Sequence, residues 1–274
     1  LRNILEGKRL LDVSVCLGGR YSPEDGKEPP EGYEEFSIQL KQNPALIKEI
    51  GTKGKFMWWK FSFAHDNEPW YMWCTYGMSG QWGTSQTKHS SFEVKYNQHG
   101  QRYFEAFGLW FNDIRHFGTF KIANTQELYK KLNSLGWDPL KEPWVPNNIY
   151  KKIFKFKNKT IAEVLLNQKI FCGVGNYIRS EVLYKAKINP LSLVKDLDEL
   201  QIENLCQEII KIAKLAYIAG GNTFSTYVDM YGNSGNFKFE LEVYQQKNDS
   251  LGNLVERIVA PDGRSIYYVK EIQK

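Results

Sequence analysis

Residues that bind metals or form disulfides are scarce in this sequence of 274 residues. The cysteines show no C-x-x-C spacing, and the four histidines show neither an H-x-x-x-H nor an H-E-x-x-H pattern. This scatter argues against a disulfide framework and a metal site, and it favours reduced core thiols in a nuclear or cytoplasmic protein. No cofactor is indicated. The cysteines are Cys16, Cys74, Cys172 and Cys206.

Long apolar runs are also absent, and no signal peptide is visible. We therefore expect no membrane partner. A composition of 42% apolar and 24% charged residues is that of a globular soluble protein. The length fits two domains, or one domain with an appendage.

Positive charge is in moderate excess, with a formal net charge of +5. Part of that excess lies between residues 151 and 159, which carry five lysines. A run of lysines is often only a solvated face. Because this one leads into a candidate phosphate-binding turn, we interpret it as a track for a polyanion. The lysines are Lys151, Lys152, Lys155, Lys157 and Lys159.

The segment 161–190 predicts two helices joined by a glycine turn. Apolar residues recur at helical spacing on both sides of Gly173-Val174-Gly175-Asn176. Two glycines let the backbone approach a ligand closely, and the N-terminus of the next helix offers N–H groups and a positive dipole end. Taken alone, the pattern favours an ordinary helical hairpin with a glycine turn over a phosphate-binding turn.

Eight positions of this segment also fit a longer motif, x-D/N-Q-x-x-x-x-G-x-G-N-x-x-x-S-E-x-L. With them the segment resembles the helix-two-turns-helix of the formamidopyrimidine-DNA glycosylase and endonuclease VIII (Fpg/Nei) family. The resemblance implies base-excision repair by a bifunctional DNA glycosylase and AP lyase that flips out an oxidised base and excises it. The matching residues are Asn167, Gln168, Gly173, Gly175, Asn176, Ser180, Glu181 and Leu183.

Enzymes of this family act through a proline and a glutamate at the mature N-terminus. The proline amine forms a Schiff base, and β,δ-elimination then cuts the strand. The sequence given begins with Leu1, so we expect about three helical turns to precede it. The alternatives are a non-catalytic protein that binds damaged or abasic DNA, and a general basic nucleic-acid binder.

Two short stretches in the first half resemble family segments that open the DNA stack. Gly77-Met78-Ser79-Gly80 resembles G-M-S-G, and residues 113–118 resemble D-x-R-R/K-F-G. The resemblance implies that Met78, Arg115 and Phe117 fill the gap left by the extruded nucleotide, with His116 at a basic backbone-contacting position. A methionine or phenylalanine is more often a core residue when it is seen in isolation.

A third stretch, Thr52-Lys53-Gly54-Lys55-Phe56, resembles the family's R/K-G/A-K-x segment. The resemblance gives Lys55 a catalytic and DNA-binding role at the phosphate and sugar of the damaged nucleotide. The plain alternative is a lysine that protects the edge of a strand.

The last third carries two further family features. Residues 220–237 partly resemble the loop that covers an extruded oxidised purine, which implies a base-recognition role for Asn222, Thr223 and Phe224. Residues 239–273 resemble the family's zinc finger without its cysteines, so we expect a zincless finger with Arg264 at its tip as a catalytic, phosphate-gripping residue. The former ligand positions, expected to form a small apolar core, are Leu251, Leu254, Val269 and Ile272.

The sequence thus predicts an α+β protein with an N-terminal antiparallel β-sandwich, a helical helix-two-turns-helix domain and a β-hairpin finger. The expected limits are 1–136 for the sandwich, 137–147 for a linker, 148–236 for the helical domain and 237–274 for the finger. We expect a monomer bound to damaged double-stranded DNA, and single-stranded DNA stays open as a partner. Asn176, Lys55 and Arg264 are expected to hold the DNA.

Overall fold

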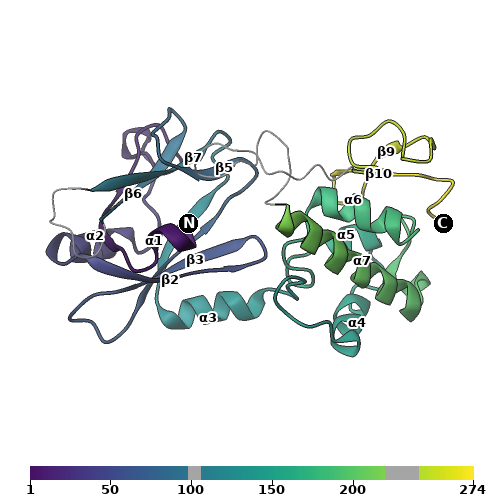
Figure 1. Ribbon diagram of the computed structural model, residues 1–274, viewed down its shortest axis with the longest axis horizontal. Coiled ribbons are helices and arrows are strands. Elements are labelled where there is room, and N and C mark those ends of the chain that lie inside the picture. The colour runs from purple at the N-terminus through teal and green to yellow at the C-terminus, as the bar shows by residue number, and fades with distance from the viewer. Residues whose placement is uncertain (98–105, 220–240) are drawn as a thin grey trace. The chain divides into compact units, whose positions relative to one another are not determined.

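The computed structural model describes residues 1–97, 106–219 and 241–274. The described chain divides into two compact units, residues 1–132 and residues 133–219 with 241–274 (Figure 1). Each unit has its own buried core. The predicted α+β class is confirmed, and the domain limits given above stay a prediction.

The first unit is built around one antiparallel ladder of eight strands in the order β5-β7-β6-β1-β2-β3-β4-β8. Three helices accompany it: α1 (Arg2–Leu5), α2 (Tyr33–Gln42) and α3 (Thr125–Ser134), with a short 3-10 turn at Pro23–Asp25. The strands are β1 (Arg9–Val15), β2 (Ala45–Lys53), β3 (Phe56–Ser62), β4 (Trp70–Thr75), β5 (Gly80–Gly83), β6 (Ser90–Asn97), β7 (Phe107–Asp113) and β8 (Thr119–Ala123).

The ladder folds over on itself, which gives the predicted sandwich. Register shifts in β1, β2 and β6 bend these strands. The bending brings β8 at one end of the ladder against strands at the other end. Phe120 on β8 stacks on Phe92 of β6 at 4.6 Å between ring centroids, and it meets Phe111 of β7 edge-on at 4.9 Å. Aromatic side chains therefore fill the space between the two layers.

Inside the predicted sandwich domain, the segment that begins at Tyr33 is a helix that the sequence analysis did not predict. Residues Tyr33–Gln42 form helix α2. Phe36, Ser37 and Leu40 are its buried positions, and this spacing of three and four residues is helical rather than alternating. The buried Phe36 ring packs against Phe61 and Trp70 of the sheet.

The second unit is mostly helical. Its elements are α4 (Pro146–Phe154), α5 (Ile161–Leu165), α6 (Asn176–Lys185), a 3-10 turn at Val194–Asp196, and α7 (Glu199–Ile218). Capping boxes fix the starts of two helices: Thr160 pairs with Glu163 before α5, and Asp198 pairs with Gln201 before α7. Trp137, which lies in the expected linker, is buried in the core of this unit.

A two-stranded hairpin of β9 (Glu256–Val259) and β10 (Ser265–Tyr268) lies beside α6 in the same unit. Ile266 on β10 is fully buried in the core shared with the helices. Of the helices that the structure describes, none combines the length and apolar character needed to cross a membrane.

Candidate nucleic-acid interface

Two neighbouring turns of the first unit carry the predicted wedge residues, and the structure brings them together. The side chains of Met78 and Phe117 are each 56% exposed, although both are apolar. Nη1 of Arg115 lies 3.3 Å from Sδ of Met78. Gly77 lies against Phe117 so closely that a Cβ atom added there would stand 2.8 Å from Cβ of Phe117. The three side chains therefore form one exposed, largely apolar projection, which we call the wedge.

Asp113 holds both turns of the wedge. Its buried carboxylate accepts hydrogen bonds from Oγ of Ser79, from the backbone N–H of Arg115 at 3.3 Å, and from the backbone N–H of Gly118 at 2.6 Å. Because these donors come from two segments 34 residues apart in the sequence, one carboxylate fixes the spacing between them. Sequence reasoning quoted Asp113 only as part of a motif and missed this role.

His116 adopts a left-handed backbone conformation, with φ of 54°, at the corner of this turn. Its carbonyl oxygen accepts a hydrogen bond of 2.8 Å from Nη1 of Arg20, which stabilises the strained corner. The imidazole is half-buried and lies 6.3 Å, centroid to centroid, from that of His89. The predicted contact between His116 and a DNA backbone stays a prediction.

Lys55 lies in the two-residue turn Gly54-Lys55 that joins β2 and β3. Gly54 has φ of 55°, a value that favours glycine, and it permits this tight hairpin connection. Lys55 itself is exposed at the end of the hairpin. A short turn between two long, paired strands is a rigid place to present an ammonium group.

In the second unit, Gln168 closes the glycine turn that precedes α6. Its Nε2 donates to the carbonyl oxygens of Leu166 and Val174, at 3.1 and 2.9 Å. Its Oε1 accepts from the backbone N–H of Gly173, which has φ of 91°. Gly175, the N-cap residue of α6, has no side chain, so the first turn of α6 is left without a side-chain cap.

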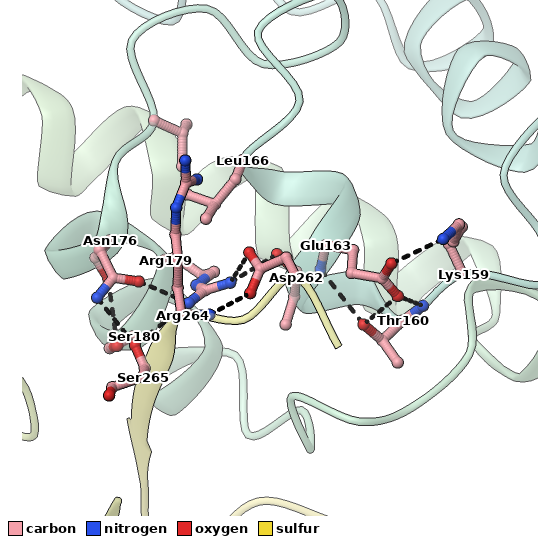
Figure 2. Close-up of polar contacts among 12 residues, drawn as sticks. Lys159, Thr160, Glu163, Leu166, Asn176, Arg179, Ser180, Asp262, Arg264 and Ser265 are labelled. Carbon is pink, nitrogen blue, oxygen red and sulfur yellow. Dashed lines mark hydrogen bonds and ion pairs between the residues drawn. The ribbon is translucent and has the colours of Figure 1, made fainter. Parts of the chain in front are cut away.

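Asn176, the first residue of α6, is tied to the hairpin tip (Figure 2). Its Nδ2 donates to the carbonyl oxygen of Ser265 at 2.9 Å, and its Oδ1 accepts from Nη2 of Arg179 at 2.6 Å. Arg264 is exposed and directly precedes Ser265. Asn176 and Arg264, predicted from separate motifs, therefore lie on adjoining segments of one unit, and we call this pair, whose binding of phosphate stays a prediction, the phosphate clamp.

The motif residues Ser180 and Glu181 hold the chain that follows the helices. Oγ of Ser180 accepts from the backbone N–H of Tyr267 at 3.4 Å. The carboxylate of the fully buried Glu181 accepts from three consecutive backbone N–H groups, those of residues 242, 243 and 244. Burial raises the pKa of Glu181, and the three N–H groups oppose that rise. The S-E pair in the motif was the available sign of these contacts.

The predicted apolar core of the finger is wrong in half of its residues. Val269 is buried and Ile272 packs beside it, but Leu251 and Leu254 are 75% and 64% exposed. The buried cluster consists instead of Tyr184, Val243, Val255 and Val269.

The leucines point outward because Asp249 closes their turn from inside. Its Oδ1 accepts from the backbone N–H groups of Leu251 and Asn253, and its Oδ2 accepts from the hydroxyl of Tyr184 at 3.0 Å. A second turn, at 269–273, is closed in the same way by Gln273, whose Oε1 accepts from the backbone N–H of Val269. The described residues contain no group of three or more side chains suited to a metal ion.

The lysines of the predicted polyanion track are all exposed, and they lie on α4 and in the turn that follows it. Lys159 forms an ion pair of 2.9 Å with Glu163. The predicted base-recognition residues Asn222, Thr223 and Phe224 lie outside the described residues. The four cysteines are buried and free of disulfides, as the sequence predicted.

Comparison with known proteins agrees with these features. Residues 135–228 match the formamidopyrimidine-DNA glycosylase H2TH domain. The chain is 30% identical over 265 residues to the formamidopyrimidine-DNA glycosylase of Ligilactobacillus salivarius strain UCC118, covering 94% of this chain and 89% of that protein. The protein of that name from a Wolbachia of Culex pipiens is 34% identical over 167 residues, and the match spans 61% of its length.

Among solved structures, the complex of Lactococcus lactis Fpg with abasic-site DNA has a TM-score of 0.79 at 25% identity, covering 100% of this chain and 95% of that one. A complex of a Lactococcus lactis Fpg mutant with Fapy-dG-containing DNA has a TM-score of 0.80 at 24% identity and the same coverage. The match to the Lactococcus lactis Fpg complex with abasic-site DNA and the match to the Ligilactobacillus protein cover 100% and 94% of this chain. The chain belongs to the formamidopyrimidine-DNA glycosylase family.

Proposed function

We propose that this chain is a DNA glycosylase of base-excision repair that excises oxidised bases, with a preference for oxidised purines. The observation that carries the proposal is the wedge: two apolar side chains stand exposed on turns that a buried carboxylate holds rigid. Exposing methionine and phenylalanine together costs free energy unless they bury themselves in a partner. An apolar wedge inserted between bases replaces stacking that is lost when a nucleotide swings out.

In this proposal Met78 and Phe117 enter the stack and Arg115 hydrogen-bonds the base left opposite the gap. Asn176 and Arg264 grip backbone phosphates beside the lesion, because an amide N–H and a guanidinium are both donors to phosphate oxygen. Lys55, presented by its hairpin turn, contacts the phosphate and sugar of the damaged nucleotide. The exposed lysines near α4 add sequence-independent attraction for the duplex.

We further propose that this protein is also an AP lyase. A proline-glutamate pair at the mature N-terminus, which is a feature of the family, would supply the reaction's nucleophile. An unprotonated terminal amine attacks the sugar C1′ and releases the base, and a Schiff base remains. The terminal amine suits this step because its ordinary pKa, near 8, is far below that of lysine.

The test is borohydride trapping of the full-length protein on oligonucleotides with one formamidopyrimidine, 8-oxoguanine, oxidised pyrimidine or abasic site. We expect a covalent adduct with the abasic strand, and adducts with oxidised purines at lower enzyme concentration than with oxidised pyrimidines. The same duplex without a lesion is the control. Selective binding to abasic DNA without an adduct or base release would instead establish the non-catalytic damaged-DNA binder.

Equal affinity for intact and abasic duplex at matched salt would contradict both of these functions, and it would leave a general nucleic-acid binder.

A further inference from the structure

Arg179 is a buried guanidinium at the centre of the contacts between α6 and the hairpin tip. It is 0% exposed, and its Nη1 donates to Oδ2 of Asp262 at 2.8 Å. Its Nη2 donates to Oδ1 of Asn176 at 2.6 Å and to the carbonyl oxygen of Ser265 at 3.3 Å. Figure 2 shows Arg179 between Asn176 and Asp262. A side chain this deeply buried cannot itself reach a DNA phosphate, so its charge serves neighbouring residues.

Arg179 sets the orientation of the Asn176 amide. Arginine is only a donor, so the amide must turn its oxygen toward Arg179. The carbonyl of Ser265 is only an acceptor, so the amide must turn its nitrogen toward Ser265. The two contacts agree on one orientation. Because Nδ2 carries two hydrogens and gives one to Ser265, the second remains for an acceptor such as a phosphate oxygen.

Asp262 connects the same guanidinium to the second member of the phosphate clamp. While Oδ2 accepts from Arg179, Oδ1 accepts from the backbone N–H of Arg264 at 3.0 Å. The intervening Gly263 has φ of 78°, so the chain turns sharply between the two residues. Asp262 thus fixes the position from which the Arg264 side chain departs.

The charges also require this arrangement. Burial lowers the pKa of Arg179, and the positive charge of Arg264 lowers it further, whereas Asp262 raises it. Two guanidinium groups near each other repel, and a carboxylate beside them offsets that repulsion. The negative charge of the carboxylate also weakens the attraction of this surface for DNA. A negative charge next to a phosphate-binding residue is unfavourable unless it serves geometry.

We propose that Asp262 and Arg179 are positioning residues that hold Asn176 and Arg264 in one phosphate-binding geometry. The inference rests on the proposed function, because it takes phosphate as the ligand of the clamp. It predicts that Asp262, although acidic, strengthens the binding of a polyanion, whereas its charge alone would weaken that binding.

The experiment measures how the affinity of the 274-residue chain for a duplex with a tetrahydrofuran abasic analogue depends on salt. The variants are Asp262→Asn, Arg179→Lys and Arg264→Ala. Arg179 and the backbone N–H of Arg264 bind different oxygens of Asp262, and asparagine replaces one of these oxygens with an NH2 donor that would face one of the two donors. Lysine keeps the charge of Arg179 but not the planar fork that reaches Asn176 and Asp262 together. Asp196→Asn, at an exposed position of the same unit, is the charge-matched control.

We expect Asp262→Asn to bind roughly tenfold more weakly although it makes the protein more positive, while Asp196→Asn binds equally or more tightly. Arg264→Ala should reduce the slope of log affinity against log salt by about 0.9, the value for one phosphate contact. Asp262→Asn and Arg179→Lys should each reduce the slope by part of that amount. In the Arg264→Ala background, Asp262→Asn should have a smaller effect than in the parent chain, because one of the two contacts that Asp262 positions is already lost.

Tighter binding by Asp262→Asn, or an unchanged slope in both positioning variants, would overturn the inference. A loss of thermal stability with an unchanged slope would show a structural role only. If the parent chain binds abasic and intact duplex equally, the proposed function fails instead, and the two failures are thereby distinguished.

Discussion

Gly77 gives the most direct test of how the wedge is built. The residue has φ of 59°, and a Cβ atom there would lie 2.8 Å from Cβ and 2.9 Å from the carbonyl carbon of Phe117. The substitution Gly77→Ala therefore introduces two separate costs. One is backbone strain, and the other is a steric clash with the neighbouring turn of the same wedge.

Gly18 separates these two costs. It has φ of 72°, but a Cβ atom there would meet nothing within 4 Å. Gly18→Ala should therefore cost only the left-handed strain of an alanine, about 1–2 kcal/mol. Gly77→Ala should add about 1–3 kcal/mol, because the backbone of residues 117–118 must move to accept the methyl group. For a unit of this size each kcal/mol corresponds to a Tm change of about 3–4 °C.

The measurements are thermal unfolding and the fluorescence of an adenine analogue placed beside an abasic site. We expect Gly77→Ala to lower Tm more than Gly18→Ala and to lose the fluorescence change that reports insertion into the stack. Gly18→Ala should keep that change. Equal Tm shifts, with insertion intact in both variants, would refute the close packing of the two turns.

Three further outcomes follow from other contacts. Met78→Ala should weaken binding to abasic duplex by about tenfold while leaving Tm within about 2 °C, because the side chain is exposed in the free protein; an unchanged affinity would remove Met78 from the wedge. Asp113→Asn should lower Tm, since its amide nitrogen faces donors that now bond to carboxylate oxygens, at about 1.5–3 kcal/mol for one lost contact; Asp12→Asn, at a half-buried carboxylate that faces Lys95 at 3.9 Å, is the control. Burial alone would raise the pKa of Asp249, but hydrogen bonds from Asn253 and others lower that pKa below its ordinary value of 3.8. The contribution of Asp249 to stability is therefore complete above pH 3.8 and is lost as the pH falls through the lower pKa of the folded state. The variant Asp249→Ala should lack this loss of stability in an acid titration.

The exposure of an apolar side chain can be predicted from sequence where the neighbouring residues restrict the backbone. Met78 and Phe117 could be predicted as exposed because glycines flank the methionine and because D-x-R-x-F-G ends in a glycine. Gly77 indeed lies against the turn that carries Phe117, and Gly118 lies against the ring of Phe111 on β7, so a side chain at either position would collide with its neighbour. Such a pattern of glycines indicates that two segments approach each other closely. This close approach holds the side chains of the wedge in place.

Helix α2 could not be predicted in the same way, because its sequence shows no clear helical spacing of apolar residues. It follows a proline-rich stretch, has Gly32 as its N-cap residue, and carries a tyrosine and a phenylalanine that suit a strand equally well. Only two bulky side chains, Phe36 and Leu40, are buried along its ten residues. Two apolar positions do not separate a helical period from an alternating one, and the packing of Phe36 on Phe61 and Trp70 decides the outcome.

In the finger, residues that align with the zinc ligands of the family do not all lie in equivalent surroundings. Replacing zinc ligands by apolar residues predicts a converging core only if the turns keep their side chains pointing inward. Zinc draws side chains inward through bonds to sulfur. In this chain Asp249 draws backbone N–H groups inward instead, so the leucines at 251 and 254 are turned out to solvent.

The helix-two-turns-helix motif predicts local structure better than the finger alignment does, because most of its polar residues make structural contacts. Gln168 closes the turn, Ser180 contacts the hairpin, and Glu181 anchors residues 242–244. These contacts leave Asn176 little freedom, so a match in the structural residues of the motif also predicts where Asn176 lies. The same reasoning sets its limit. Arg179 occupies a position that the motif leaves open, and Asp262 lies outside the motif, so the exact geometry of Asn176 and Arg264 belongs to this chain rather than to the motif.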